Sequence, residues 1–141
     1  MKQSSKITII ETIALIHITD RKLLLARSRG KKAFYMPGGK RDRDEDQHAT
    51  LIREVKEELQ VKLDPSTLTF YGVFEAEAYG KAEGVLVRTF CYTGKYIGRL
   101  SHGSEVEEIG FFSHKDYFGK EDTAPAVRLI FKDLKSKGLI E

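Results

Sequence analysis

Three glutamates in the middle of the chain are the residues whose types and spacing are best suited to chemistry. Glu54, Glu57 and Glu58 lie at positions i, i+3 and i+4, which places them on one helical face within about 100° of arc. Like charges this close repel each other, and a bound divalent cation relieves the repulsion, because hard cations such as Mg²⁺ prefer carboxylate oxygens. The triplet therefore indicates a metal site, although an isolated pattern of this kind is most often a solvated helix surface.

A helix from about Asp46 to Leu59 is predicted to carry these carboxylates. Its apolar residues fall on one broad face at about 100° per residue. These residues are Leu51, Ile52, Val55 and Leu59. The glutamates are predicted to project from the opposite face. Asp44 or Asp46 is placed to cap the first turn, because a short acidic side chain accepts hydrogen bonds from the unpaired N–H groups there.

A glycine-rich loop precedes the predicted helix. Pro37-Gly38-Gly39 ends the short apolar run Phe34–Met36, and no regular element is expected to pass through it. The next segment, Lys40–Asp46, is charged and lacks periodicity, which indicates a loop. Taken alone, a Pro-Gly-Gly run is most often an ordinary turn. Its spacing from the three glutamates is much more specific than either feature by itself.

That spacing resembles the Nudix signature, G-x5-E-x7-R-E-U-x-E-E-x-G-U, in which U is a bulky aliphatic residue. The matching stretch is Gly39–Val61, called the box below. Glu45 and Arg53 occupy the positions that the signature requires between the glycine and the glutamates. Gln60 is the one departure, because the family has glycine there.

Members of this family hydrolyse nucleoside diphosphates linked to another moiety, and a loop-helix-loop holds one to three divalent ions against the pyrophosphate. The resemblance implies that the chain is a Mg²⁺-dependent pyrophosphohydrolase, with Mn²⁺ as an alternative ion. The implied metal ligands are the Gly39 carbonyl and the carboxylates of Glu54, Glu57 and Glu58. Arg53 matches the arginine that pairs with a box glutamate, here Glu45, and so orients the metal-binding carboxylates.

Two further roles lie outside the box. The general base varies within the family, and the candidate here is Glu105, in the acidic cluster Glu105–Glu108. That cluster is equally consistent with a solvated loop. The candidate substrate-binding residues are Arg27, Phe34 and Tyr35, with core packing as the alternative for the aromatic ones.

Three hypotheses for the activity stay open. The first is a MutT-like enzyme that hydrolyses nucleoside triphosphates, oxidised ones included, which the short chain without an extra N-terminal domain favours. The second is an enzyme of the same class that cleaves ADP-ribose, a nucleotide sugar or a dinucleoside polyphosphate. The third is a Nudix-fold sensor that binds a nucleotide without hydrolysing it. Such sensors usually lose box glutamates, and this chain keeps all of them.

Gln60 is expected to leave the activity intact. The family glycine ends the helix with a positive φ, a conformation that glycine adopts without strain. Gln60 either takes that conformation at a cost of roughly 1 kcal/mol or ends the helix differently. Neither outcome reaches the implied metal ligands.

The rest of the chain predicts the elements that position the box. Strands are expected at Ile7–Thr19, Lys22–Arg27, Leu68–Tyr79, Val85–Ile97 and Glu107–Phe112. Residues 124–137 are predicted to form an amphipathic helix that Gly138 ends. The resemblance covers about residues 7–137 and implies the Nudix fold. The predicted class is α+β, an α/β/α sandwich in which a mixed sheet packs between helices.

Composition and charge exclude several functional classes. The chain has 141 residues, 40% of them hydrophobic, which suits one domain over residues 1–141. A net charge of +3 with scattered Lys and Arg predicts no stable nucleic-acid complex but suits a small anionic nucleotide. Cys91 is the only cysteine, so no disulfide framework or cysteine-based zinc site is expected. No run resembles a membrane span, which favours a cytoplasmic protein, either a monomer or a homodimer.

Overall fold

The computed structural model describes residues 6–141, so the polar start of the chain, Met1–Ser5, lies outside the described residues. Its longer strands are β1 (Thr8–Ile16), β3 (Lys22–Ser28), β6 (Thr69–Glu77), β7 (Val85–Thr93) and β9 (Val106–Phe112). Its two-residue strands are β2 (Ile18–Thr19), β4 (Gly38–Gly39), β5 (Lys62–Leu63) and β8 (Tyr96–Ile97). Its helices are α1 (Gln47–Leu59), α2 (His114–Phe118) and α3 (Pro125–Ser136), with a 3-10 helix η1 at Pro65–Thr67.

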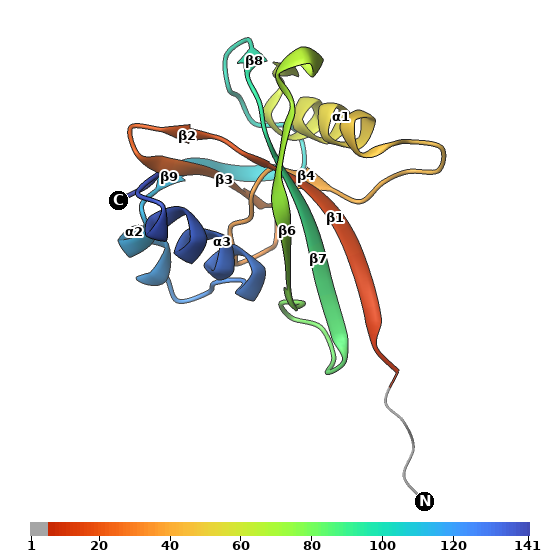
Figure 1. The fold of residues 1–141 in the computed structure, drawn as a ribbon, viewed down its shortest axis with the longest axis vertical. Coiled ribbons are helices and arrows are strands. Elements are labelled where there is room, and N and C mark those ends of the chain that lie inside the picture. Colours follow the sequence, from red (N-terminus) through yellow and green to blue (C-terminus); the bar gives the residue numbers. More distant parts are fainter. Residues whose placement is uncertain (1–5) are drawn as a thin grey trace, which may run out of the picture.

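The strands form a mixed arrangement with helices on two sides (Figure 1). One sheet has the order β4-β1-β7-β6, a second has the order β2-β3-β9, and β5 pairs with β8. β1 and β7 run parallel, whereas β4 and β6 pair with them in antiparallel orientation. The predicted α+β class, with a mixed sheet packed between helices, is therefore confirmed.

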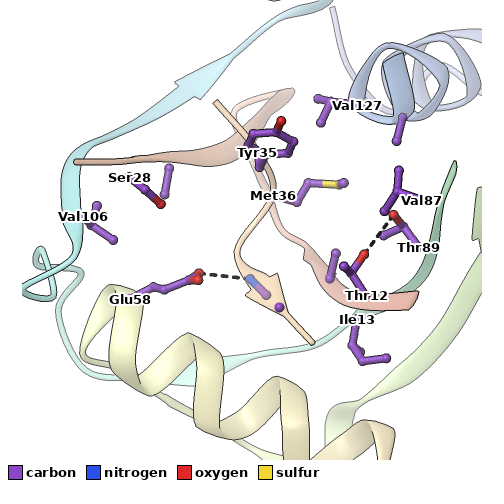
Figure 2. A pocket seen from close by; sticks show the side chains of 15 residues that line it. Thr12, Ile13, Ser28, Tyr35, Met36, Glu58, Val87, Thr89, Val106 and Val127 are labelled. Atoms are coloured by element: carbon purple, nitrogen blue, oxygen red, sulfur yellow. Dashed lines mark hydrogen bonds between the residues drawn. The ribbon is translucent and has the colours of Figure 1, made fainter. Parts of the chain in front are cut away.

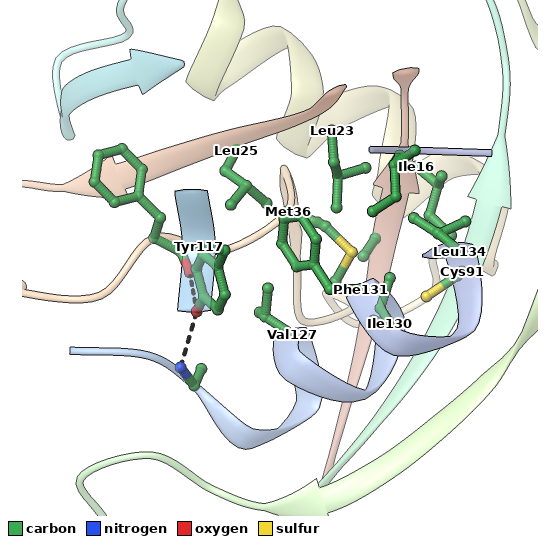
Figure 3. Close-up of a cluster of buried hydrophobic side chains, with 14 residues drawn as sticks. Ile16, Leu23, Leu25, Met36, Cys91, Tyr117, Val127, Ile130, Phe131 and Leu134 are labelled. Atoms are coloured by element: carbon green, nitrogen blue, oxygen red, sulfur yellow. Dashed lines mark hydrogen bonds between the residues drawn. The ribbon is translucent and has the colours of Figure 1, made fainter. Parts of the chain in front are cut away.

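Alternate residues of β1 face two separate hydrophobic cores, as the two-residue period of a strand requires. Ala14 and Ile16 belong to the cluster that packs against α3, which Figure 3 shows. Ile13 and Leu15 belong to the cluster that packs against α1. All four side chains are buried. Burial on both faces is the main stabilisation of such a layered fold, and it fixes β1 between the two helices.

The predicted C-terminal helix is present as α3. Its buried residues are Ala126, Val127, Ile130, Phe131 and Leu134. Pro125 begins the helix, where the missing N–H has no helical partner to lose, and Gly138 follows its end with a φ of 72°. Tyr117 of α2 fastens the start of α3 to the core. Its hydroxyl accepts the Ala124 N–H at 2.8 Å and donates to the Phe34 carbonyl at 3.1 Å (Figure 3).

Two of the predicted strands are each divided in the structure. Residues 7–19 form β1 and then β2, which His17 separates, and residues 85–97 form β7 and then β8. In each case the two parts belong to different sheets. β-branched residues favour extended backbone along the whole run. Their pattern does not show where the chain leaves one sheet for the next.

The prediction that no regular element passes through Pro37-Gly38-Gly39 was wrong, because Gly38 and Gly39 form β4. They pair with Ala14 and Ile13 of β1. Gly38 has a φ of 147°, and a Cβ at this position would overlap the Ile13 carbonyl oxygen. Glycine alone allows the two backbones to approach this closely. The loop that leads into α1 is therefore attached directly to the central sheet.

The helix α2 has five residues and was not among the predicted elements. Ser113 and Asp116 form a capping box at its start, with hydrogen bonds of 3.0 Å in both directions. This Ser-x-x-Asp pattern was a usable local indication of a helix start. None of the helices in the described part of the chain is long and apolar enough to cross a membrane.

Candidate active site

The two ends of α1 follow from local sequence. Asp46 is the N-cap, and its carboxylate accepts the Ala49 N–H at 2.8 Å, so Asp46 rather than Asp44 fills the predicted role. Gln60 ends the helix in the left-handed conformation with a φ of 59°. Its side-chain oxygen accepts the Ser101 hydroxyl at 3.0 Å. Of the two outcomes expected for Gln60, the strained one is observed.

The prediction that the glutamates project opposite the apolar face was wrong for Glu58, and Glu54 is partly buried as well. The large buried residues of α1 are Leu51, Val55 and Leu59. Glu58 lies beside this buried stripe because it follows Leu51 by seven residues, which is nearly two helical turns. It is half-buried and points toward the sheet, where its Oε1 accepts the Gly38 N–H at 3.0 Å (Figure 2).

These surroundings strongly raise the pKa of the Glu58 carboxyl group. Loss of contact with water raises the pKa of its carboxyl to about 8, and the Gly38 N–H partly offsets this effect. The negative charges of Glu54 and Glu57 raise the pKa further. A carboxyl group in this position holds a proton or binds a cation, because an isolated anion is costly in a partly dehydrated site.

The backbone of Gly39 lies directly against Glu54. A Cβ at Gly39 would overlap the Glu54 carboxylate, so any larger residue there would displace that carboxylate. Burial raises the pKa of Glu54, while Arg53 lowers it. Gly38 contacts Glu58 and Gly39 contacts Glu54. β4 is thus held against the carboxylate-bearing side of α1 at both of its residues.

Arg53 connects the loop before α1 to the glutamates on it. Its Nε donates to Glu45 Oε2 at 2.7 Å and its Nη2 donates to Glu45 Oε1 at 3.0 Å. This two-point contact is the main reason that the pKa of Glu45 falls to about 2. Nη1 of Arg53 also lies 3.4 Å from Glu54 Oε2 and 3.3 Å from Glu57 Oε1. The structure therefore brings together Glu45, Arg53, Glu54 and Glu57, four residues of the box.

A cavity of about 270 Å³ opens beside Glu58 (Figure 2). Its walls come from β1, β3, β7 and the start of α3, and from the segment between Tyr35 and Gly39. Glu58 is the only charged side chain among the described residues that line it. The carboxylate site and the cavity are therefore contiguous, and the cavity itself is largely neutral.

The three candidate substrate residues lie in different environments. Tyr35 lines the cavity and is 40% exposed. Phe34 is buried in the cluster under α3, where its ring contacts Phe112 and lies 4.7 Å from Nζ of Lys120. Arg27 donates to the Lys31 carbonyl and pairs with Glu108. Only Tyr35 of these three is a lining residue of the cavity.

Glu105 is exposed and lies close to the cavity along the chain, since the next residue, Val106, is one of the lining residues. Within the acidic cluster, Glu107 pairs with Arg29 at 3.1 Å and Glu108 pairs with Arg27 at 3.3 Å. The Glu105 carboxylate has no ion pair among the described residues. Of the three glutamates, it is the one that is available for another partner.

A model of the NUDIX domain matches residues 10–134, a range that contains the whole box and most of α3. The chain belongs to the Nudix family. It is accordingly a pyrophosphohydrolase, and the reaction class predicted from the box is confirmed. None of the curated proteins matches the chain at a significant level.

Solved structures show the Nudix fold that the box implied. The E. coli ORF135 protein is 23% identical, covers 93% of this chain and 94% of its own, and has a TM-score of 0.69. A MutT protein from Methanosarcina mazei Go1 is 19% identical, with coverages of 96% and 99% and a TM-score of 0.73. An ADP-ribose pyrophosphatase from Streptococcus suis is 22% identical, with coverages of 90% and 91% and a TM-score of 0.58. At these identities the likeness concerns the fold.

Nudix hydrolases generally use divalent metal ions, and the donors in this Nudix site fit such an ion. Carboxylate and carbonyl oxygens are the ligands of hard cations. Burial and the neighbouring charges of Glu54 and Glu57 raise the pKa of Glu58, and a divalent cation would stabilise the ionised form of this cluster. Among the described residues, no three acidic, His or Cys side chains are already arranged around a common point. Arg53 contacts the carboxylates of Glu54 and Glu57, and the Gly38 N–H donates to Glu58.

Three residues of this Nudix site were not singled out in the sequence. Thr12 and Thr89 line the cavity from β1 and β7. Gly103 packs against the end of α1, where its N–H donates to the Glu58 carbonyl at 2.9 Å and a Cβ would overlap the Glu57 carbonyl. These contacts join segments far apart in the chain, and no local pattern marks them.

Proposed function

We propose that this Nudix hydrolase cleaves a pyrophosphate bond of nucleoside triphosphates, including oxidised ones, in a Mg²⁺-dependent reaction. The observation that supports it is the contact between the carboxylate cluster and a neutral cavity beside Glu58. In this arrangement the phosphates of the substrate lie beside the glutamates, and the uncharged nucleoside lies in the neutral cavity. The cavity, at about 270 Å³, lies just below the usual size range of ligand pockets, which favours a single nucleoside over a dinucleoside.

In this proposal the cation is held by the Gly39 carbonyl and by the carboxylates of Glu54, Glu57 and Glu58. Mg²⁺ fits because it is usually held by few carboxylates together with substrate phosphates, and Mn²⁺ is the alternative. When bound, the ion neutralises phosphate oxygens and lowers the pKa of a coordinated water. Arg53 keeps the glutamates oriented through its two-point contact with Glu45.

The proton of the attacking water needs an acceptor, and Glu105 is proposed as that general base. Its carboxylate has no ion-pair partner in the described chain, whereas Glu107 and Glu108 are each paired with an arginine. The water oxygen bonds to one phosphorus and its proton passes to the carboxylate. The anhydride P–O bond breaks, and the bridging oxygen leaves with the bonding electron pair as part of the released phosphate or pyrophosphate. Because the box glutamates bind the cation in this scheme, they are less free to accept the proton.

A substrate screen tests the proposal directly. The purified protein is incubated with Mg²⁺ and either nucleoside triphosphates, ADP-ribose, nucleotide sugars or dinucleoside polyphosphates, and released phosphate and pyrophosphate are measured. Nucleoside triphosphates should give the highest kcat/KM, and excess chelator should abolish turnover. Preferential cleavage of ADP-ribose or a nucleotide sugar would overturn the substrate assignment. Undiminished turnover in chelator would overturn the metal assignment.

Replacing the proposed base gives a separate test. Glu105→Gln should lower kcat by roughly 10²- to 10⁴-fold, the usual contribution of a general base. Glu107→Gln is the matched control, because it lies in the same cluster but is paired with Arg29. Equal activity of the two variants would remove Glu105 from the mechanism and leave the metal site standing.

A further inference from the structure

The cavity has two chemically different ends. Figure 2 shows Glu58 at one end and the side chains of Thr12 and Thr89 at the other. The charged end adjoins β4 and α1, where the phosphates are proposed to bind. The opposite end is formed by β1, β7 and the start of α3. A substrate that spans the cavity therefore passes from a carboxylate region to a region whose polar side chains are two hydroxyls.

The two hydroxyls form a pair at the centre of the sheet. Thr12 and Thr89 are direct partners on the parallel strands β1 and β7, and their Oγ1 atoms are 3.1 Å apart. Thr89 is only 4% exposed. Either hydroxyl can be the donor of this hydrogen bond. Each hydroxyl has one O–H and two lone pairs, so the pair keeps one O–H and further lone pairs for a ligand.

The surroundings of the pair favour an uncharged ring. Val87, Val127 and Met36 line the cavity near it, and the described lining residues include no Lys, Arg or His. A phosphate group bound at this end of the cavity would lose its hydration without gaining a positively charged partner. The exposed aromatic side chain of Tyr35 lies along the same cavity. Apolar walls with a few polar groups are the usual design of a pocket for a flat heteroaromatic ligand.

We propose that the Thr12–Thr89 pair is a substrate-binding element that hydrogen-bonds the edge of the nucleobase. This proposal rests on the proposed function of the site. A ring carbonyl accepts the free O–H of the pair, and a ring amino group donates to a hydroxyl oxygen. Because the pair offers both possibilities, it does not distinguish a carbonyl edge from an amino edge. The cavity therefore selects its substrate by ring size and flatness, and accepts bases with either edge.

Isosteric replacements test the role of the pair. Thr12→Val and Thr89→Val keep the side-chain shape but remove the hydroxyl. Each should raise KM for nucleoside triphosphates by about five- to fiftyfold, as expected when a buried polar edge loses its partner, with a smaller change in kcat. Thr8→Val is the matched control, because Thr8 lies on the same face of β1 but is exposed and outside the cavity. If the KM values of Thr12→Val and Thr89→Val are the same as that of Thr8→Val, the proposal is wrong.

The tolerance for both edges is tested on the unmodified protein. ATP and GTP differ in presenting an amino group or a carbonyl on rings of equal size, as do CTP and UTP. Values of kcat/KM within each pair should agree within about tenfold, because a hydroxyl pair that can both donate and accept rejects neither the amino edge nor the carbonyl edge. A difference of a hundredfold or more within either pair would contradict the proposal.

Binding of nucleosides separates this proposal from the proposed function. The methyl groups of Thr12 and Thr89 are followed by NMR in the metal-free protein during titration with adenosine, guanosine, cytidine and uridine. Shifts at these methyls without shifts at Thr8 support the base site, even if no triphosphate is hydrolysed and the proposed function fails. The absence of shifts at both methyls would overturn the base site, whatever the protein hydrolyses.

Discussion

α1 and α3 are similar in length and contribute to cores on opposite faces of β1, but they are built differently. α3 has 12 residues and buries five, all of them apolar. α1 has 13 residues and buries four, and two partly buried carboxylates, Glu54 and Glu58, lie at the edge of that buried stripe. α3 serves stability, since burial of its apolar side chains has no electrostatic cost. α1 carries a cost, because its carboxylates are partly dehydrated and repel each other.

The difference between the helices shows how a reaction centre is placed in a stable fold. α1 keeps enough apolar contact to stay attached to the sheet through Leu51, Val55 and Leu59. Its charged residues can then adopt an arrangement that would be unfavourable on its own. If this view is correct, changes to the carboxylates of α1 should alter catalysis much more than stability. Changes to the buried residues of α3 that lie outside the cavity should do the reverse.

The largest effect is expected when the glutamates of α1 lose their charge. Glu57→Gln and Glu58→Gln should each lower kcat with saturating Mg²⁺ by roughly 10³-fold or more, because several kcal/mol of charge stabilisation are lost. Thermal unfolding should show that both variants stay folded. Glu77→Gln, an exposed glutamate of β6, is the control. Near-normal rates in both box variants would contradict the assignment of the metal ligands.

On α3 the expectation is reversed. Phe131 is fully buried and its ring stacks on Tyr117 at 4.8 Å between centroids. Phe131→Ala should lower the free energy of unfolding by about 3–5 kcal/mol through lost burial and the cavity left behind. The Tm of the variant should be lower than that of the wild type. At a temperature well below that Tm, kcat of the variant should stay within about threefold of the wild-type value. A large fall in kcat for the folded variant would show that α3 does more than stabilise.

The parts of the site that the sequence predicted are those close together in the chain. Arg53 and the glutamates lie on one helix, where helical spacing brings them together, and Glu45 lies in the short loop directly before that helix. The N-cap role of Asp46 and the end of α1 at Gln60 are also local, and both were among the expected outcomes. Local backbone geometry determines such contacts, whatever the rest of the fold does.

The parts that could not be predicted depend on which strands pair. Thr12 and Thr89 are 77 positions apart and meet only because β1 and β7 are parallel neighbours. The pairing of Gly38 with β1 converts an expected turn into a strand. The seven-residue spacing from Leu51 explains why Glu58 points toward the sheet. The hydrogen bond that Glu58 accepts from Gly38 depends on the position of β4, which the spacing does not predict. Long-range register is not encoded in any short pattern.

A smaller effect should appear in the stability of the metal-free protein. The pKa of Glu58 is raised from 4.5 to about 8, so between these values the folded state holds a proton that the unfolded chain has released. Stability contributed by this group is present below about pH 4.5 and is lost as the pH rises to about 8. In excess chelator, Tm should therefore fall over this range. The loss should be roughly 1–2 kcal/mol, since the site is partly solvated.

Glu58→Gln separates this effect from all other titrations. The variant has no proton to lose, so its Tm in chelator should change less with pH than that of the wild type and should be higher near pH 8. Glu77→Gln should keep the wild-type slope. Identical pH profiles for Glu58→Gln and the wild type would mean that α1 does not carry the electrostatic cost that distinguishes it from α3.

The smallest effect concerns the end of α1. Gln60 has a φ of 59°, a conformation that costs a non-glycine residue roughly 1 kcal/mol and glycine very little. Gln60→Gly removes that strain but also removes the exposed hydrogen bond from Ser101 and increases the freedom of the unfolded chain. The net gain in the free energy of unfolding should be below about 1 kcal/mol. The value of kcat should be unchanged, because Gln60 is exposed and hydrogen-bonds to Lys56 and Ser101, not to the box glutamates. Denaturant unfolding and the triphosphate assay measure the two quantities. A clear change in kcat would show that the geometry of the helix end is transmitted to Glu57 and Glu58, so that even the strained terminus of α1 belongs to the catalytic part of the molecule.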